Sequence, residues 1–379
     1  MKRKLNYPRI IGTIIIIILI ISIVIGLSFN SQTKEEIVIG SIQALTGETA
    51  KHGNNVKDGI DLAVEEINKN GGVNGKKIKI IHEDENCIPT KAVSAAQKLI
   101  NIDKTKIILG PTCSSSSMAV APVAEQNKVI MFTPISSVPA LRQAGDYIFR
   151  NRVSGEPHSI KMANFAYNEL NARTASTLYI NLDNGISYSE EFIKEFEKLG
   201  GKILNTEAYE KGLQDFRTQL LKIKENNPDV IYLAGQASQN AIKQARELGI
   251  KTQIIAPTTL QEADLFDIAG DSANGIYYSY ESFDPNSKEQ VVSYYQEKYK
   301  SKYGRESEVF AANAYDAVML ISKALEKCEE NTDCIKNHLY SIKNYEGVSG
   351  ITTFDKDGEV LKPLIIKKTE NRKFVFHSN

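Results

Sequence analysis

Residues 107–117 of this chain read Ile107-Ile108-Leu109-Gly110-Pro111-Thr112-Cys113-Ser114-Ser115-Ser116-Ser117. An apolar strand ends here in a Gly-Pro turn, and a run of serines opens a helix predicted over 114–126. Free N–H groups and hydroxyls at the start of a helix, with the positive end of its dipole, form a site for a carboxylate or another anion. Open α/β sheets bind ligands at the carboxyl ends of their strands, so this stretch predicts a ligand site. The alternative is that Ser114 or Ser115 only caps its own helix.

The next predicted strand, 129–132, ends in Thr133-Pro134-Ile135-Ser136-Ser137, a second set of hydroxyl side chains. If the two strands are neighbours in a parallel sheet, both sets lie at the same edge. Two hydroxyl clusters converging on one crevice are more than helix capping needs. We therefore predict one binding site that includes Ser114, Ser115, Ile135, Ser136 and Ser137.

Apolar strand-like runs alternate with segments of helical periodicity through most of the chain. Strand 36–42 precedes helix 54–68, and the same order returns between helix 187–199 and strand 253–256. This alternation is typical of βαβ units, so we predict an α/β protein with parallel sheets covered on both faces. After residue 288 the pattern changes to helices over 288–303, 308–327 and 332–344, followed by short strands near 351–354, 364–368 and 373–377.

The composition excludes several classes of function. The 379 residues contain 46 Lys+Arg and 46 Asp+Glu, so no basic excess drives counterion-release binding to nucleic acid. Five His and four Cys leave little material for a metal cluster, and no His is placed as a base for the serine run. We predict no catalytic residues and no cofactor. Single histidines such as His82 and His158 are expected to be structural, with His52 the most plausible exception.

The N-terminus is typical of a membrane anchor. Residues 1–9 carry four cations and no acid, and residues 10–29 carry no charge. About twenty apolar residues rising ~1.5 Å each span a ~30 Å hydrocarbon core. We predict a transmembrane helix over 10–29, a cytoplasmic basic segment over 1–9, and a body outside the cytoplasm. The alternative is a cleaved signal peptide and a secreted or periplasmic body, although 28–31 is a poor cleavage site.

The cysteines agree with an extracytoplasmic location. Cys87 and Cys113 each follow a predicted strand, and Cys328 and Cys334 share one polar stretch. An even count in an exported protein predicts disulfides. Zinc is the weaker alternative, because the chain has no Cys-x-x-Cys and only His338 lies close to a cysteine.

With these residues, the sequence resembles the solute-binding proteins of branched-chain amino acid ABC transporters, the leucine/isoleucine/valine-binding type. The resemblance runs from about residue 36 to 368, and its motifs occur in the family's order. They are Leu45-Thr46-Gly47, Glu65-Glu66-Ile67-Asn68 before Gly71-Gly72-Val73-Asn74-Gly75, Gly110-Pro111, Phe149-Arg150, Gln244-Ala245-Arg246-Glu247-Leu248-Gly249, Ala269-Gly270-Asp271 and Tyr345-Glu346-Gly347-Val348-Ser349-Gly350.

The resemblance implies two Rossmann-like lobes with parallel central sheets, joined by three crossovers, which is the type I periplasmic-binding-protein fold. Lobe one would comprise 36–153 plus 284–349, and lobe two 154–283 plus 350–379. It also implies a disulfide at Cys87 and Cys113, where some members of the family carry one.

The resemblance further implies roles for single residues. Ser114 and Ser137 would hold a ligand carboxylate, and the main-chain carbonyl of Ile135 would accept from an ammonium group. Residues covering the ligand stand at the positions of His52, Asn184 and Gln236, where the family often has aromatic side chains. Thr258 stands where the family has an acidic partner for the ammonium. Burying an ammonium without a carboxylate costs several kcal/mol, so the ligand is an amino acid, a small amide or another carboxylate.

The expected function is that of an extracytoplasmic solute-binding protein of an ABC importer. It would bind a small amino acid of the branched-chain type, or a related carboxylate or amide, by closure of its lobes and deliver it to permease subunits in the membrane. The alternative is a ligand-sensing receptor ectodomain without a transport role. A receptor of that kind would normally add a second membrane span or an intracellular module.

Overall fold

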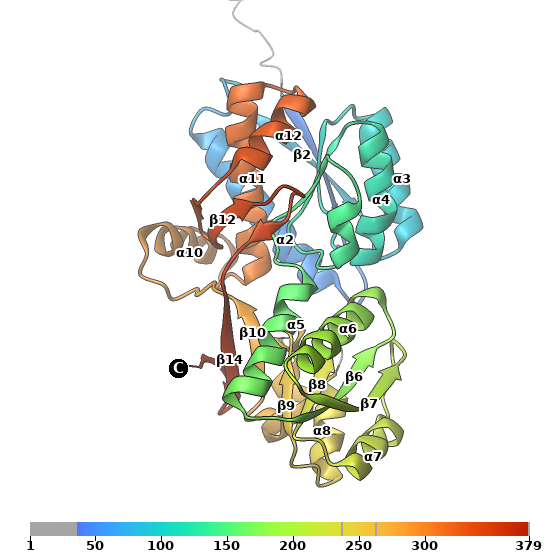
Figure 1. The fold of residues 1–379 in the computed structure, drawn as a ribbon. Helices are drawn as coiled ribbons and strands as arrows, with labels where there is room; N and C mark the ends of the chain where they lie inside the picture. Colours follow the sequence, from blue (N-terminus) through green and yellow to red (C-terminus); the bar gives the residue numbers. More distant parts are fainter. Residues whose placement is uncertain (1–35, 236–237, 262–263, 378–379) are drawn as a thin grey trace, which may run out of the picture.

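The computed structural model describes residues 36–235, 238–261 and 264–377, which form two α/β lobes, one above the other in Figure 1. Within these ranges the strands form sheets of five, seven and three strands. The predicted basic segment 1–9 and anchor 10–29 lie outside them. No helix in the described ranges is both long and apolar enough to cross a membrane.

The first sheet is entirely parallel, in the order β2-β1-β3-β4-β5. Its strands are β1 (Ile37–Gln43), β2 (Ile78–Asp84), β3 (Ile107–Leu109), β4 (Ile130–Thr133) and β5 (Ile148–Arg150). The carboxyl ends of all these strands therefore lie at one edge. The strand order reverses between β1 and β3, and ligands bind at such a switch point in open α/β sheets.

Helices cover both faces of this sheet. On one face lie α3 (Pro89–Asn101) and α4 (Ser114–Gln126), with small buried residues such as Ala96 and Ala121 against the strands. On the other lie α2 (Ala50–Lys69) and α11 (Val309–Cys328). An added Cβ at Gly59 of α2 would collide with the main-chain oxygen of Ala311 in α11, so glycine permits the close approach of these two helices. The remaining helices of this lobe are η1 (Pro139–Gln143), α10 (Gln290–Tyr303) and α12 (Thr332–Ser341).

The second sheet has the order β15-β14-β10-β9-β8-β6-β7. Its parallel strands are β6 (Thr174–Ile180), β7 (Lys202–Tyr209), β8 (Val230–Ala234), β9 (Gln253–Ala256) and β10 (Tyr277–Glu281). The end of the chain adds β14 (Leu364–Glu370) and β15 (Lys373–Phe376), which are antiparallel. Helical segments of this lobe are α5 (Gly155–Asn164), η2 (Phe165–Glu169), α6 (Asp183–Lys198), α7 (Arg217–Asn226), α8 (Gln239–Glu247), η3 (Thr258–Leu260), α9 (Leu265–Ala269) and η4 (Gly270–Ala273).

The described chain passes between the two large sheets three times, after β5, after β10 and before β14. The third sheet, formed by β11 (Tyr345–Gly347), β12 (Gly350–Phe354) and β13 (Val360–Leu361), precedes the last passage.

Residues 350–361 belong with the first lobe, whereas the sequence analysis assigned them to the second. The ring of Phe354 in β12 lies 5.8 Å from that of Phe132 and 5.9 Å from that of Phe149, centroid to centroid. All three rings are buried in the core of the first lobe. Burial of Phe354 there retains the whole third sheet, and the chain enters the second lobe only after Leu361.

A buried polar cluster lies where the three passages meet; we call Asn151, Glu281, Asn313, Ser349 and Lys362 the hinge cluster. Lys362 Nζ donates to Asn313 Oδ1 at 2.9 Å, to Ser349 Oγ at 2.7 Å and to the Asn151 carbonyl at 3.3 Å. Asn313 Nδ2 donates to Glu281 Oε2 at 3.1 Å. Because a buried charge needs partners on all sides, this cluster fixes the three passages relative to one another.

His158, in the first turn of α5, packs against the second sheet. It is fully buried, and its Nδ1 lies 2.9 Å from Ser279 Oγ of β10. Burial, reinforced by the charge of Arg152, lowers the pKa of His158 to about 3. The folded protein therefore keeps this imidazole neutral.

The pKa of His158 predicts a loss of stability in mild acid. The unfolded chain binds a proton below pH ~6.5 while the folded protein does not, so the free energy of unfolding falls by about 1.4 kcal/mol per pH unit below 6.5. Chemical denaturation of wild type and His158→Asn checks this. Between pH 7 and 5.5 we expect the wild type to lose about 1 kcal/mol more than the variant. Equal losses in both proteins would contradict the assignment.

Candidate ligand-binding site

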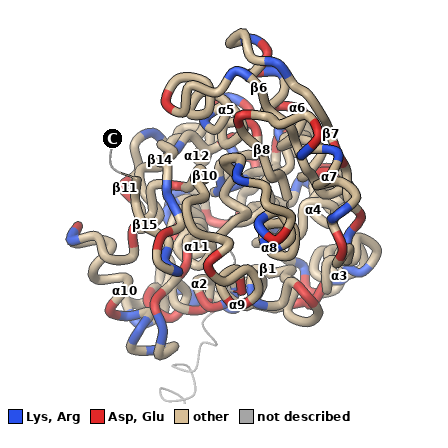
Figure 2. Tube along the Cα trace, turned by 90° about the horizontal axis from the view of Figure 1, so that it is seen from below, with Lys and Arg blue, Asp and Glu red and all other residues tan. Residues whose placement is uncertain are grey.

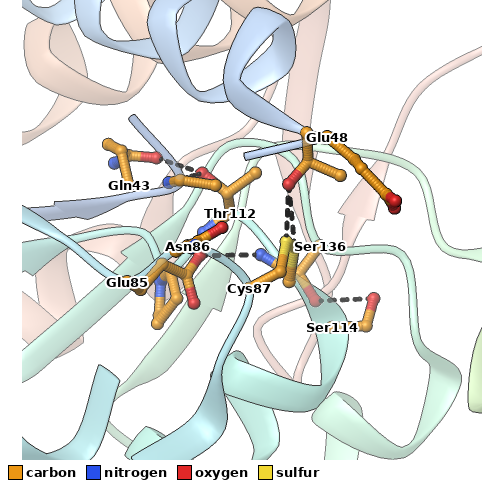
Figure 3. The surroundings of a disulfide bond; sticks show 12 residues. Gln43, Glu48, Glu85, Asn86, Cys87, Thr112, Ser114 and Ser136 are labelled. Atoms are coloured by element: carbon orange, nitrogen blue, oxygen red, sulfur yellow. Dashed lines mark hydrogen bonds between the residues drawn. A yellow bond between two sulfur atoms is a disulfide. The ribbon is translucent and has the colours of Figure 1, made fainter. Parts of the chain in front are cut away.

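Two serines from neighbouring strands meet at the carboxyl edge of the first sheet. Ser114 is the first residue of α4, directly after the β3 turn, and Ser136 follows β4. Their hydroxyl oxygens lie 3.3 Å apart, as Figure 3 shows. Ser136 and Ser137 are buried, Ser114 is half-buried and Ser115 is exposed. The parallel pairing of β3 with β4 brings the two hydroxyl sets together.

Side-chain hydroxyls fix the loops that carry these serines. Thr133 Oγ1 donates to the Pro111 carbonyl at 2.9 Å and accepts from the Ser136 N–H at 3.1 Å. Thr112 Oγ1 donates to Gln43 Oε1 at 2.7 Å, which joins the β3 turn to the end of β1 (Figure 3). The ends of β1, β3 and β4 are therefore linked by bonds that use threonine side chains instead of the sheet ladder.

A buried carboxylate supports the turn before α4. Glu85 Oε1 accepts from the N–H groups of Thr112 at 2.8 Å and Cys113 at 3.0 Å. Burial raises the pKa of Glu85. Glu85 was not identified from the sequence, where it follows a strand as one acid among several. Its oxygen lies close to the sulfurs of Cys87 and Cys113, but the structure joins these sulfurs to each other, so they do not form a metal site with it.

The first turn of α4 has amide groups to offer a ligand. Ser117 N–H bonds to the Cys113 carbonyl at 2.8 Å and begins the helical ladder. The amides of 114–116 precede that ladder, as the first N–H groups of every α-helix do. An anion at this end of α4 can therefore meet N–H groups and the Ser114 hydroxyl together. This is the chemistry that a carboxylate requires.

Arg152 and the rings of His52 and Phe310 contact one another beside the serine loop, and we take them as a second wall of the candidate site. The His52 ring, in the first turn of α2, meets Phe310 edge-on with centroids 5.2 Å apart. The guanidinium carbon of Arg152 lies 4.8 Å from the centroid of Phe310. Burial lowers the pKa of His52; the charge of Arg152 lowers it further, and Glu308 opposes both. Neither Arg152 nor Phe310 was singled out from the sequence.

The Ile135 carbonyl has a partner that the resemblance did not imply. It accepts from Arg152 Nη1 at 2.8 Å, where the resemblance implied a ligand ammonium. The only sequence signal for Arg152 is its place just after an apolar strand, in Asn151-Arg152-Val153. Because Arg152 follows the carboxyl end of β5, it lies at the same edge of the first sheet as the loops that carry the serines.

Two other predicted ligand residues, Asn184 and Thr258, lie on the second lobe. Asn184 is half-buried in the first turn of α6, and Thr258 is buried at the start of η3, after β9. Gln236 lies outside the described residues. Within the described ranges, neither Asn184 nor Thr258 hydrogen-bonds to the serines. They stand at the edge of their own sheet.

The lobes also meet through exposed charges. Lys211 Nζ of the second lobe lies 3.2 Å from Glu48 Oε2 of the first. Figure 2 shows both signs of charge interspersed along the chain, in keeping with a net charge of zero.

Comparison with known proteins agrees with this geometry. The family model described as "Periplasmic binding protein" matches residues 36–373. A Leu/Ile/Val-binding protein of Escherichia coli is 26% identical over 361 residues, which is 94% of this chain and 95% of that protein. A leucine binding protein of Thermotoga maritima is 30% identical with a TM-score of 0.84, over 90% of this chain and 98% of its own.

A third relative was solved with a ligand. It is the branched-chain amino acid transporter substrate binding protein of Streptococcus pneumoniae in complex with isoleucine, 27% identical with a TM-score of 0.82. The match covers 90% of this chain and 98% of that one. The chain thus belongs to the periplasmic binding protein family, and its two lobes have the type I α/β fold of the family's branched-chain amino acid-binding members.

Proposed function

We propose that this protein is an extracytoplasmic solute-binding protein of an ABC importer, which binds a small branched-chain amino acid or a related carboxylate or amide. The observation that carries the proposal is the 3.3 Å approach of Ser114 Oγ and Ser136 Oγ at the first turn of α4. Hydroxyls and free helical amides at one point suit a carboxylate head group. Its relatives from E. coli and T. maritima are amino acid-binding proteins by name. The proposed activity is binding without chemical conversion.

Lobe closure is the proposed mechanism. The serines lie on the first lobe, and Asn184 and Thr258 lie at the edge of the second. A ligand held by the serines completes its contacts only when the second lobe approaches, so it binds the closed form more tightly than the open one. We take 36–150 with 290–361 as lobe one and 155–281 with 364–377 as lobe two, since their strands belong to separate sheets.

We also propose that residues 10–29 anchor the protein in the cell membrane and leave the body outside. Twenty uncharged residues after four cations support this orientation. An anchored binding protein stays next to the permease that receives its ligand. Such permease subunits are the proposed partners.

An extracytoplasmic body also accounts for the cysteines. Cys87 and Cys113 are paired with Cα atoms 5.4 Å apart, and Cys328 and Cys334 with Cα atoms 5.5 Å apart, both within the range that a disulfide spans. We propose that both disulfides form in the exported protein. The first supports the turn on which Ser114 lies, and the second closes the turn between α11 and α12.

A ligand panel tests the proposed function. Thermal shift and calorimetry on the full-length protein with amino acids, amides and small carboxylates should show saturable binding of at least one branched aliphatic ligand, with a matching rise in melting temperature. No stabilisation by any of these ligands would contradict a binding role.

Removal of the serine hydroxyls tests the site. In Ser114→Ala with Ser136→Ala, we expect a carboxylate ligand to lose a few kcal/mol of binding free energy, because each hydrogen bond to a charged group contributes about 1.5–3 kcal/mol. Calorimetry against the ligand found in the panel measures this. Ser94→Ala is the control, since Ser94 is exposed on α3 and bonds only its own helix, at Thr90 O. If the double variant binds as the control does, the carboxylate lies elsewhere.

Thiol counting tests the disulfides. Exported, unreduced protein should expose no reactive thiol after denaturation, and four after reduction. From the loop lengths, loss of Cys87–Cys113 should cost about 3–3.5 kcal/mol of unfolding free energy and loss of Cys328–Cys334 about 2 kcal/mol. Paired Cys→Ser variants in chemical denaturation measure both costs. Four reactive thiols before reduction would disprove the assignment.

A further inference from the structure

Arg152 is a buried cation in the wall of the proposed ligand site. Its side chain is only 6% exposed, and it lies in the first passage between the lobes. Nη1 donates to the Ile135 carbonyl, one residue from Ser136, at 2.8 Å. Nε lies 3.7 Å from Glu281 Oε1, too far for a hydrogen bond. The guanidinium is therefore bonded to the serine loop and only loosely paired with an acid.

Its surroundings keep Arg152 in this place. The guanidinium lies against the ring of Phe310 at 4.8 Å. Glu281 is buried and held by Asn313 Nδ2 at 3.1 Å, so it cannot follow the arginine. Moving Arg152 away would leave Glu281 with a weaker set of partners in a buried site. The positive charge is thus a fixed part of the wall.

A ligand ammonium meets three obstacles here. The Ile135 carbonyl accepts from Arg152, so an ammonium that shared this oxygen would lie directly beside the guanidinium. The guanidinium is charged at all physiological pH values and repels a second cation nearby. Thr258, buried at the edge of the second sheet, supplies a hydroxyl without charge. Glu281, the buried carboxylate nearest to Arg152, is already flanked by two cations, Arg152 and Lys362, so it has no unpaired charge to offer a buried ammonium.

The features that suit a carboxylate remain. Ser114, Ser136 and the first amides of α4 are unaffected by Arg152, and a nearby guanidinium favours an anion. We propose that Arg152 makes this site selective for carboxylates that lack an α-ammonium group, of which branched aliphatic 2-oxo acids are the chemical class closest to the amino acids. This inference rests on the proposed binding function and identifies its ligand class.

A matched pair of ligands tests the proposal. L-leucine and 4-methyl-2-oxopentanoate share a carbon skeleton and a carboxylate and differ in the α-ammonium. In calorimetry on ligand-free, full-length protein, the oxo acid should bind at least about tenfold more tightly. Equal or tighter binding of leucine overturns the selectivity while leaving the binding function intact. Failure of both ligands and of the whole panel would instead contradict the binding function itself, and this inference with it.

Variants of Arg152 show whether it is the cause. Arg152→Met combined with Glu281→Gln removes both charges, so neither is left buried alone. The ratio of the two dissociation constants should shift by at least about tenfold towards leucine. Arg173→Met is the matched control, because Arg173 also lies over a ring, that of Tyr167 at 4.0 Å, but is exposed on the second lobe. A ratio unchanged in the double variant overturns the role of Arg152.

If the double variant does not fold, Arg152→Lys gives a second measurement. Lysine keeps the charge but loses the planar group that reaches the Ile135 carbonyl beside Phe310. Continued preference for the oxo acid in Arg152→Lys supports exclusion by charge. A shift to leucine in that variant overturns exclusion by charge, since the positive charge is still present.

Discussion

The hydroxyl of Thr133 holds together the two loops on which the ligand site depends. It donates to the Pro111 carbonyl at the end of β3 and accepts from the Ser136 N–H after β4. Because β3 and β4 are parallel neighbours, one short side chain can reach both loops. Ser114 and Ser136 are therefore placed by buried bonds within one lobe. A preformed half-site of this kind binds with little ordering cost.

The two lobes, in contrast, must stay joined and still move relative to each other. The hinge cluster keeps them joined. Lys362 contacts Asn151 and Ser349, and Asn313 in turn donates to Glu281 of the second sheet. Arg152 connects this cluster to the ligand wall, because it approaches Glu281 on one side and the Ile135 carbonyl on the other. The charge that selects the ligand is thus positioned by the same residues that join the lobes.

The sequence was sufficient to predict features that depend on local pattern and on parallel pairing. The helix over 114–126 has the bounds expected from its serines and its apolar spacing, and the approach of Ser114 to Ser136 follows from two consecutive strands. The bounds of helix α5 could not be predicted, because Gly155 and Pro157 begin it and its buried positions show no clear stripe. Residues 350–361 were assigned to the wrong lobe, since only packing shows where Phe354 is buried. Arg152 could not be identified, because a single arginine after a strand has the same sequence pattern whether it is exposed or buried.

The meeting of all three passages at the buried hinge cluster has a mechanical consequence. A rigid point on the boundary between two bodies leaves rotation about that point as the easy motion and makes sliding costly. A closing rotation therefore pivots near the hinge cluster, and its backbone torsion falls on the passages themselves, 151–154, 282–289 and 362–363. The exposed ion pair between Glu48 and Lys211 joins the two lobes outside that cluster, so it must break when the lobes rotate apart.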